Sequence, residues 1–199
     1  MLQEARTGHV LYIPGEHDVI GDNGKEFFRR FGAGTPGGWY SFDHHGTHFV
    51  ALINVLNLKA GGLGFLGADQ LAWLKQDLAA RSASTPIVVF AHMPLWALYP
   101  AWGWGTDDAA EALSYLQRFG SVTVLNGHIH QLQQTVEGHV RFYTARSTAY
   151  PQPAPGVGPA PGALKDLAPG QLGHAIGLRN VRHVKGVPTP AITDIALVA

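Results

Sequence analysis

Short apolar runs bounded by turn residues recur along the first 150 residues of the chain. Runs of this kind are typical of strands buried on both faces of a sheet. The chain has four of them, at residues 9–14, 48–55, 86–92 and 121–126. Each one ends at Gly, Pro, His or Asn or just before such a residue, so we expect four short buried strands with loops at their ends.

Apolar residues with helical spacing lie between these runs. They predict one helix over residues 27–31 and a second over residues 71–78. A third helix is expected to begin at Asp108, where Asp108 and Glu111 form a D-x-x-E capping-box pattern, and to stop at Gly120. Strands that alternate with helices in this way predict an α/β fold built on a layered sheet.

Two more segments have the pattern of β-hairpins, with turns at His45-Gly46 and at Glu137-Gly138. From Pro151 onward the chain changes character, since eight of its 13 prolines lie there. We expect a domain over residues 1–150 and a Pro/Gly-rich wrap over residues 151–199 that packs on the same domain without regular structure. Four apolar residues of the wrap are candidate anchors: Leu172, Ile176, Leu178 and Val181.

Composition excludes several classes of protein. The 199 residues carry a formal net charge of +0, with 46% hydrophobic and 14% charged residues, which argues against a disordered tail and against binding to nucleic acid polymers. The absence of cysteine excludes disulfides and Cys-based zinc sites. No apolar run approaches membrane-spanning length and the first residues lack a signal-peptide pattern, so we expect a cytoplasmic protein with no membrane contact.

Histidines follow three of the predicted strands. Glu16 and His17 come after the first, His92 ends the third, and His128 and His130 follow the fourth. Open α/β sheets bind ligands at the carboxyl ends of their strands, where these side chains would converge. Imidazole and carboxylate are ligands of Zn, Mn and Fe. A single histidine after a strand is more often a structural residue, so only the combination favours a metal site.

The order of these pieces resembles the calcineurin-like metallophosphoesterase superfamily. Members carry G-N-H-[DE], then a single histidine in [AGH]-H-x-P, then G-H-x-H, and this chain has GEHD at 15–18, AHMP at 91–94 and GHIH at 127–130. The resemblance implies a layered β-sandwich flanked by helices and the hydrolysis of phosphoesters. Site roles follow from it by position. It implies Glu16, His92 and His128 as ligands of one metal, His130 as a ligand of a second, and His17 as the catalytic histidine.

Two departures from the family pattern change the expected site. The D-x-H and G-D-x-x-D motifs are absent from this sequence, so we expect an N-terminally truncated form that lacks the first β-α-β portion. In the family, the absent motifs supply the carboxylate that bridges the two metals. Asp22 follows GEHD instead, so we do not expect it to replace that carboxylate. Glu16 stands where the family has Asn, and its charge would partly compensate for the lost bridge. We therefore expect one divalent ion (Mn, Zn or Fe) per chain.

Such a site predicts slow hydrolysis of small phosphomonoesters or phosphodiesters, cyclic nucleotides included, with aryl phosphates as the best substrates. Trp96 and Trp102 belong to a dense aromatic loop after His92, and Arg146 follows the second hairpin. We interpret these three residues as candidate substrate contacts. Core packing or an interface for the tryptophans, and a surface role for Arg146, remain open.

Two other functions stay possible on the sequence alone. The first is a non-catalytic remnant of the fold. The second is an ester hydrolase that works without metal through Ser147 or His17. Loss of the first strands would also leave a sheet edge and an apolar face uncovered, which predicts a homo-oligomer.

Overall fold

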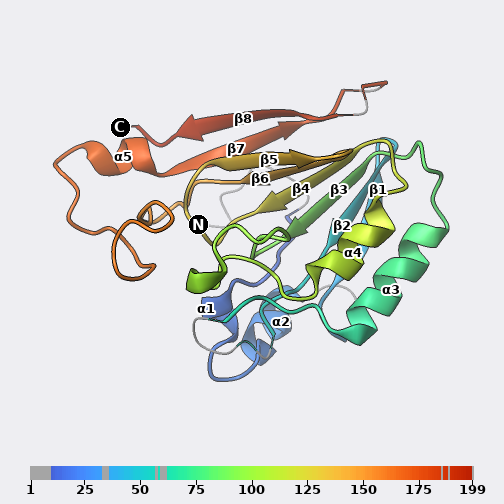
Figure 1. The fold of residues 1–199 in the computed structure, drawn as a ribbon, viewed down its shortest axis with the longest axis horizontal. Coiled ribbons are helices and arrows are strands. Elements are labelled where there is room, and N and C mark those ends of the chain that lie inside the picture. Colours follow the sequence, from blue (N-terminus) through green and yellow to red (C-terminus); the bar gives the residue numbers. More distant parts are fainter. Residues whose placement is uncertain are drawn as a thin grey trace.

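A six-stranded mixed sheet forms the centre of the computed structural model, which describes residues 10–32, 36–56, 58, 62–184, 186–187 and 189–198. The strand order is β1-β2-β3-β4-β6-β5 (Figure 1). Neighbours from β2 through β3 and β4 to β6 are parallel, and the two outer strands are antiparallel to their neighbours. The strands are β1 (Tyr40–His44), β2 (Thr47–Ala51), β3 (Ile87–Ala91), β4 (Val122–Asn126), β5 (Gln133–Glu137) and β6 (Val140–Thr144).

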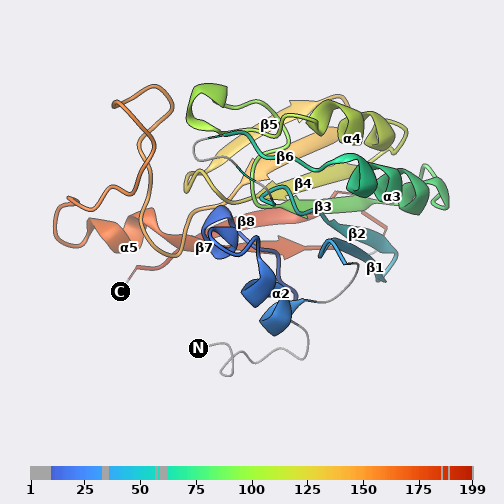
Figure 2. The ribbon, with the colours of Figure 1, turned by 90° about the horizontal axis from the view of Figure 1, so that it is seen from below.

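Two helices cover one face of this sheet, α3 (Ala68–Ala79) and α4 (Ala109–Leu116). They lie side by side (Figure 2). Alternate residues of the strands meet the apolar stripes of the helices because side chains in a strand alternate between its two faces. The result is one large buried cluster, which includes Leu74, Leu116, Val89, Val124 and Phe142.

A C-terminal hairpin lies on the opposite side of the sheet from α3 and α4 (Figure 1). It consists of β7 (Gly177–Arg182) and β8 (Ala191–Ala196), and α5 (Gln171–Ala175) precedes it. The guanidinium of Arg179 in β7 lies 5.6 Å from the ring centroid of Tyr143 in β6. The layered α/β fold flanked by helices is therefore confirmed.

The expectation of an irregular wrap is wrong beyond residue 170. Residues 151–170 have no helix or strand, but the prolines become sparse after Pro169, and β7 and β8 pair over six register positions. Leu178 is not an anchor, because 54% of it is exposed on the hairpin. The division into a domain over residues 1–150 and a packed segment after it stays a prediction, as does the homo-oligomer.

Residues 10–14 are not a strand, in contrast to the sequence prediction for 9–14, of which His9 lies outside the described residues. A strand needs a ladder partner, and no ladder bond to residues 10–14 is present in the part of the chain that the structure describes. The segment instead contacts the sheet through the Tyr40 hydroxyl, which donates to the Tyr12 carbonyl at 3.1 Å. It leads into α1 (Glu16–Val19) and α2 (Lys25–Phe31), so the helix at 27–31 is confirmed.

The hairpins form as expected, although the second turn is shifted by one residue to Gly138-His139. Asp108 does not cap α4 with its side chain, so that the capping-box prediction is wrong. Its carboxylate instead accepts the backbone N–H groups of Leu66 and Gly67 at 2.9 and 2.8 Å. The Asp108 carboxylate therefore makes a tertiary contact, and it does not bond the N-terminus of α4 as the local pattern predicts.

A buried histidine links the sheet to α3. The His48 side chain is fully buried, with Nδ1 2.9 Å from Asp43 Oδ1 and Nε2 2.7 Å from Asp77 Oδ2. Burial lowers the pKa of His48, but its hydrogen bonds to Asp77 and Asp43 raise the pKa by more, so the net shift is upward. Arg81 also pairs with Asp43, at 2.6 Å.

This arrangement predicts a pH-dependent stability. A raised pKa in the folded state stabilises the chain below the unfolded pKa of about 6.5, and the effect is lost as the pH rises through the folded value. Burial raises the pKa of Asp77, but its hydrogen bonds from His48 and Ser41 lower the pKa by more, so the net shift is downward. The stabilisation that the ionised Asp77 provides is therefore lost only at acidic pH. We expect wild type to exceed His48→Gln in unfolding free energy most at about pH 5–6. Urea titrations between pH 5 and 9 measure this difference, and a constant gap would refute the charged state of His48.

Candidate metal centre

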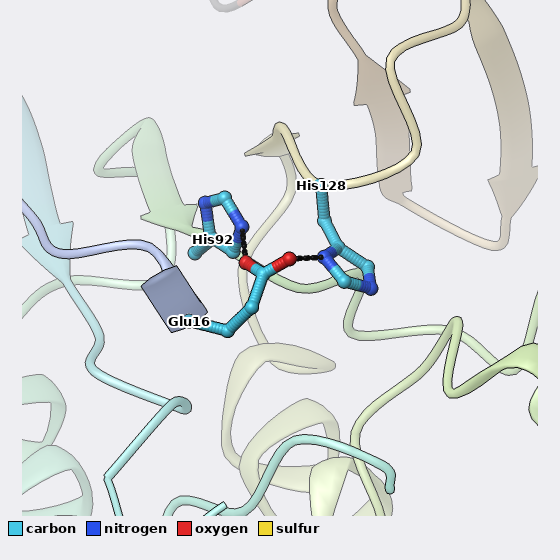
Figure 3. Close-up of side chains that lie close together, drawn as sticks. All are labelled: Glu16, His92 and His128. Atoms are coloured by element: carbon cyan, nitrogen blue, oxygen red, sulfur yellow. Dashed lines mark ion pairs between the residues drawn. The ribbon is translucent and has the colours of Figure 1, made fainter. Parts of the chain in front are cut away.

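Three side chains from distant parts of the sequence meet at the carboxyl ends of the central strands. Glu16 is the first residue of α1, His92 follows β3 directly, and His128 follows β4 after one glycine. Their side chains point toward one another (Figure 3). The parallel pairing of β3 with β4 puts the two histidine loops at the same edge, which is where open α/β sheets bind their ligands.

The carboxylate of Glu16 lies between the two imidazoles. Its Oε1 is 3.1 Å from His128 Nδ1, and its Oε2 is in contact with His92 Nε2. One donor atom from each residue lies within 4.8 Å of the other two. All three side chains are mostly buried, with 10–23% of their surface exposed.

The environment keeps Glu16 ionised. Burial raises the pKa of its carboxyl, but the close contacts with His128 and His92 lower it by more, so the pKa lies well below the ordinary value. An ionised carboxylate oxygen and two imidazole nitrogens are a ligand set that suits Zn, Mn or Fe. Apart from their contacts with Glu16, the buried nitrogens His92 Nε2 and His128 Nδ1 have no hydrogen-bond partner among the described residues. The three residues therefore fit one divalent ion, and the structure describes no other group of three such ligands.

A glycine brings α1 close to His92. A Cβ atom at Gly15 would lie 2.9 Å from His92 Cε1, a separation that side chains do not tolerate. Glycine at this position therefore lets the first turn of α1 approach the imidazole. The backbone also bends at the other ligand, since His128 has a φ of 64°.

A cavity of about 770 Å³ opens beside the three ligands. Glu16, His17 and His128 lie in its wall, together with Trp102. The remaining wall is mostly apolar, and its described residues are Val19, Ile20, Gly21, Asn23, Val55, Leu58, Gly62, Met93, Trp104, Gln152, Pro161 and Gly162. The volume is in the range of small-molecule sites.

The two further histidines of the family pattern lie near the group but outside it. His17 is exposed, its Nε2 is 3.7 Å from Glu16 Oε1, and it faces the cavity. His130 donates from Nδ1 to the Tyr150 carbonyl at 2.6 Å. Burial lowers the pKa of His130, which keeps its ring neutral near neutral pH.

Trp96 and Arg146 are not in the wall of this cavity, in contrast to Trp102. Trp96 packs against the main core, with its ring centroid 5.2 Å from that of Phe142. Arg146 donates to the His174 carbonyl. Ser147, the candidate nucleophile of a metal-free hydrolase, accepts the Ala149 N–H at 2.9 Å instead of pairing with a base. The structure thus gives packing and backbone contacts to these three residues.

Gln152 is a wall residue that the sequence analysis missed. Its Nε2 donates to the His128 carbonyl at 2.8 Å, while Gln131 Nε2 donates to the Gln152 carbonyl at 2.8 Å. The segment 150–153 is therefore bonded to the loop that carries His128 and His130. No periodic pattern marks this Pro-rich segment, so only its three-dimensional position identifies it.

Comparisons with known proteins concern the family and the fold of this chain. The family model described as calcineurin-like phosphoesterase matches residues 2–132. Among solved structures, a dimetal phosphatase from Danio rerio is similar with a TM-score of 0.55 and 14% sequence identity, over 69% of this chain and 60% of that chain. The present chain thus spans about 60% of the length of that phosphatase, and the likeness concerns the fold. A comparison with curated proteins gives no match.

Proposed function

This chain belongs to the calcineurin-like phosphoesterase family, and we propose that it hydrolyses phosphoesters with one divalent ion held by Glu16, His92 and His128. The observation that carries the proposal is the convergence of their three donor atoms within 4.8 Å, beside a cavity whose wall includes Glu16 and His128. The same convergence argues against a non-catalytic remnant, because burying an ionised carboxylate between two imidazoles has no evident packing benefit.

The chain's own residues account for binding and proton transfer. A divalent ion in such a site supplies charge for a phosphoryl oxygen and lowers the pKa of bound water. Glu16, His92 and His128 would hold the ion, and the cavity lined by Glu16 and His128 would receive the substrate. His17 is exposed to the cavity beside Glu16, where its imidazole can donate a proton to the leaving oxygen.

The wall of the cavity supports a small substrate with an apolar ester group. Trp102, Ile20 and Val55 contribute apolar surface beside the ligands, and Pro161 and Gly162 limit the cavity from the C-terminal segment. We propose phosphomonoesters or phosphodiesters, cyclic nucleotides among them, with aryl phosphates as the fastest substrates. A single ion would supply less charge than the two-metal sites that stabilise both the attacking and the leaving oxygen, so we expect slow turnover.

Hydrolysis of aryl phosphates tests the proposal. With Mn²⁺ or Zn²⁺ we expect wild type to hydrolyse p-nitrophenyl phosphate or its bis-ester, and chelator to abolish the reaction. His17→Gln should lower kcat by about 100-fold or more because the leaving oxygen loses its proton donor. His139→Gln, at an exposed turn, is the matched control and should retain full activity.

The alternatives give different outcomes in the same assay. No hydrolysis with any divalent metal would favour the non-catalytic remnant. Hydrolysis of p-nitrophenyl acetate that persists in chelator would favour the metal-free ester hydrolase. The first result would refute the proposed metal-dependent phosphoesterase, and the second would refute it when no phosphoester is hydrolysed.

A further inference from the structure

Buried asparagine side chains hold the backbone on both sides of His92. Asn126 is the last residue of β4 and is 5% exposed. Its Nδ2 donates to the carbonyls of Ala91 at 3.1 Å and Met93 at 2.8 Å, the two residues that flank His92. Because both partners are carbonyls, the amide nitrogen must face them, and the orientation of the side chain is fixed.

Asn54 makes the matching contact from the segment that follows β2, the other neighbour of β3. Its side chain is fully buried. Its Nδ2 donates to the Met93 carbonyl at 2.9 Å, and its Oδ1 accepts the Met93 N–H at 3.2 Å. Nδ2 also donates to Thr106 Oγ1 at 2.8 Å, and that hydroxyl donates to the Pro94 carbonyl.

Burying these two amide side chains carries a risk in free energy that a purely structural role does not require. A buried amide that loses a partner costs about 1–3 kcal/mol, whereas an apolar side chain would fill the same space without that risk. Asn126 Oδ1 is buried and has no hydrogen-bond partner among the described residues. The ladder between β3 and β4 does not need either side chain, because it is built from backbone groups.

The position of the contacts indicates what they do. His92 lies beyond the last paired residue of β3, where no sheet ladder fixes the backbone. Asn126 reaches it from β4, two residues before His128, and the Gly127 N–H donates to the His92 carbonyl at 3.1 Å. The placement of His92 relative to His128 therefore depends on these side-chain and backbone bonds.

We infer that Asn54 and Asn126 are positioning residues that set the distance of His92 from Glu16 and His128, and through it the affinity of the site for a divalent ion. The inference rests on the proposed function, because it requires that the three ligands bind an ion. Neither asparagine is among the three ligands. They act through the backbone of residues 91–93.

Metal titration of folded variants tests this inference. Asn126→Leu and Asn54→Leu should weaken the binding of Zn²⁺ and Mn²⁺ by about 10-fold or more in calorimetry, as is typical when a group that orients a ligand is lost. Asn126→Ser keeps one donor and should lie between wild type and Asn126→Leu, which covers the case in which the leucine variant fails to fold. The visible spectrum of bound Co²⁺ should also change, since it reports ligand geometry.

Gln70→Leu is the matched control. Gln70 is another buried amide, and it bonds the backbone of Ile53 and Leu66 instead of residues 91–93. It should lose comparable stability in urea but keep the wild-type metal affinity and Co²⁺ spectrum. If the asparagine variants bind metal within twofold of wild type with an unchanged spectrum, or if Gln70→Leu weakens binding equally, the inference is wrong. If wild type itself binds no divalent ion, the proposed function fails and the inference with it.

Discussion

The Glu16→Ala variant is expected to bind a divalent ion about 100-fold or more weakly than wild type, the upper end of the range for residues around a metal site. Glu16 supplies the only charged ligand of the described group, and its carboxylate is in contact with both imidazoles. Without it, two imidazole nitrogens remain. Calorimetric titration with Mn²⁺ and Zn²⁺ measures the change directly.

A second substitution at the same position separates charge from ligation. Glu16→Gln keeps an oxygen donor but removes the negative charge, so we expect an affinity between those of wild type and Glu16→Ala. Glu26→Gln is the control, because Glu26 on α2 pairs with the exposed Arg29 and Arg30 and does not belong to the ligand group. If Glu16→Gln binds as tightly as wild type, then the carboxylate charge does not compensate for the absent motifs.

Phe142→Ala is expected to lower the unfolding free energy by about 3–5 kcal/mol, as is typical of phenylalanine in a packed core. Phe142 is fully buried in β6 and belongs to the cluster between the sheet and the helices. Trp96 packs against it, so the cavity left by alanine would also change the surroundings of that indole. Urea unfolding followed by tryptophan fluorescence measures both effects.

The matched control for this prediction is Val136→Ala. Val136 lies in the neighbouring strand β5 but is 60% exposed, so its loss should change stability by about 0.5 kcal/mol or less. A similar loss of stability in the two variants would show that β6 is not part of the main core. Metal affinity should stay at the wild-type value in Val136→Ala, because this side chain is largely exposed on β5, which β6 separates from β4.

Much of the metal centre could be predicted from sequence because its ligands follow apolar runs. The runs at 86–92 and 121–126 are buried strands, and parallel strands deliver their following residues to one edge. Gln152 and the two asparagines were missed for another reason. Their roles depend on hydrogen bonds between residues far apart in sequence, such as Gln152 with His128, and no local pattern reports such contacts.

The errors in the fold have similar causes. Residues 10–14 have the apolar composition of a strand, but strand formation also needs a neighbour, and composition does not report one. Asp108 carries a capping pattern, yet its carboxylate accepts bonds from residues about 40 positions earlier in the chain. Proline content correctly indicated irregular structure for 151–170, whereas averaging it over the whole tail hid the hairpin β7–β8.

The mixed sheet also has a consequence for folding kinetics. The hairpins β1–β2 and β5–β6 join neighbours in sequence, whereas the parallel pairs join distant residues, as in His48 with Ile87 and Val88 with Thr123. Local pairs form early and distant pairs form late, because closing a long loop costs entropy before any contact is gained. Two of the three metal ligands, His92 and His128, follow the strands of one such late pair, β3 and β4. We therefore expect partly folded chains to lack an assembled site, so that ion binding would report the pairing of β3 with β4.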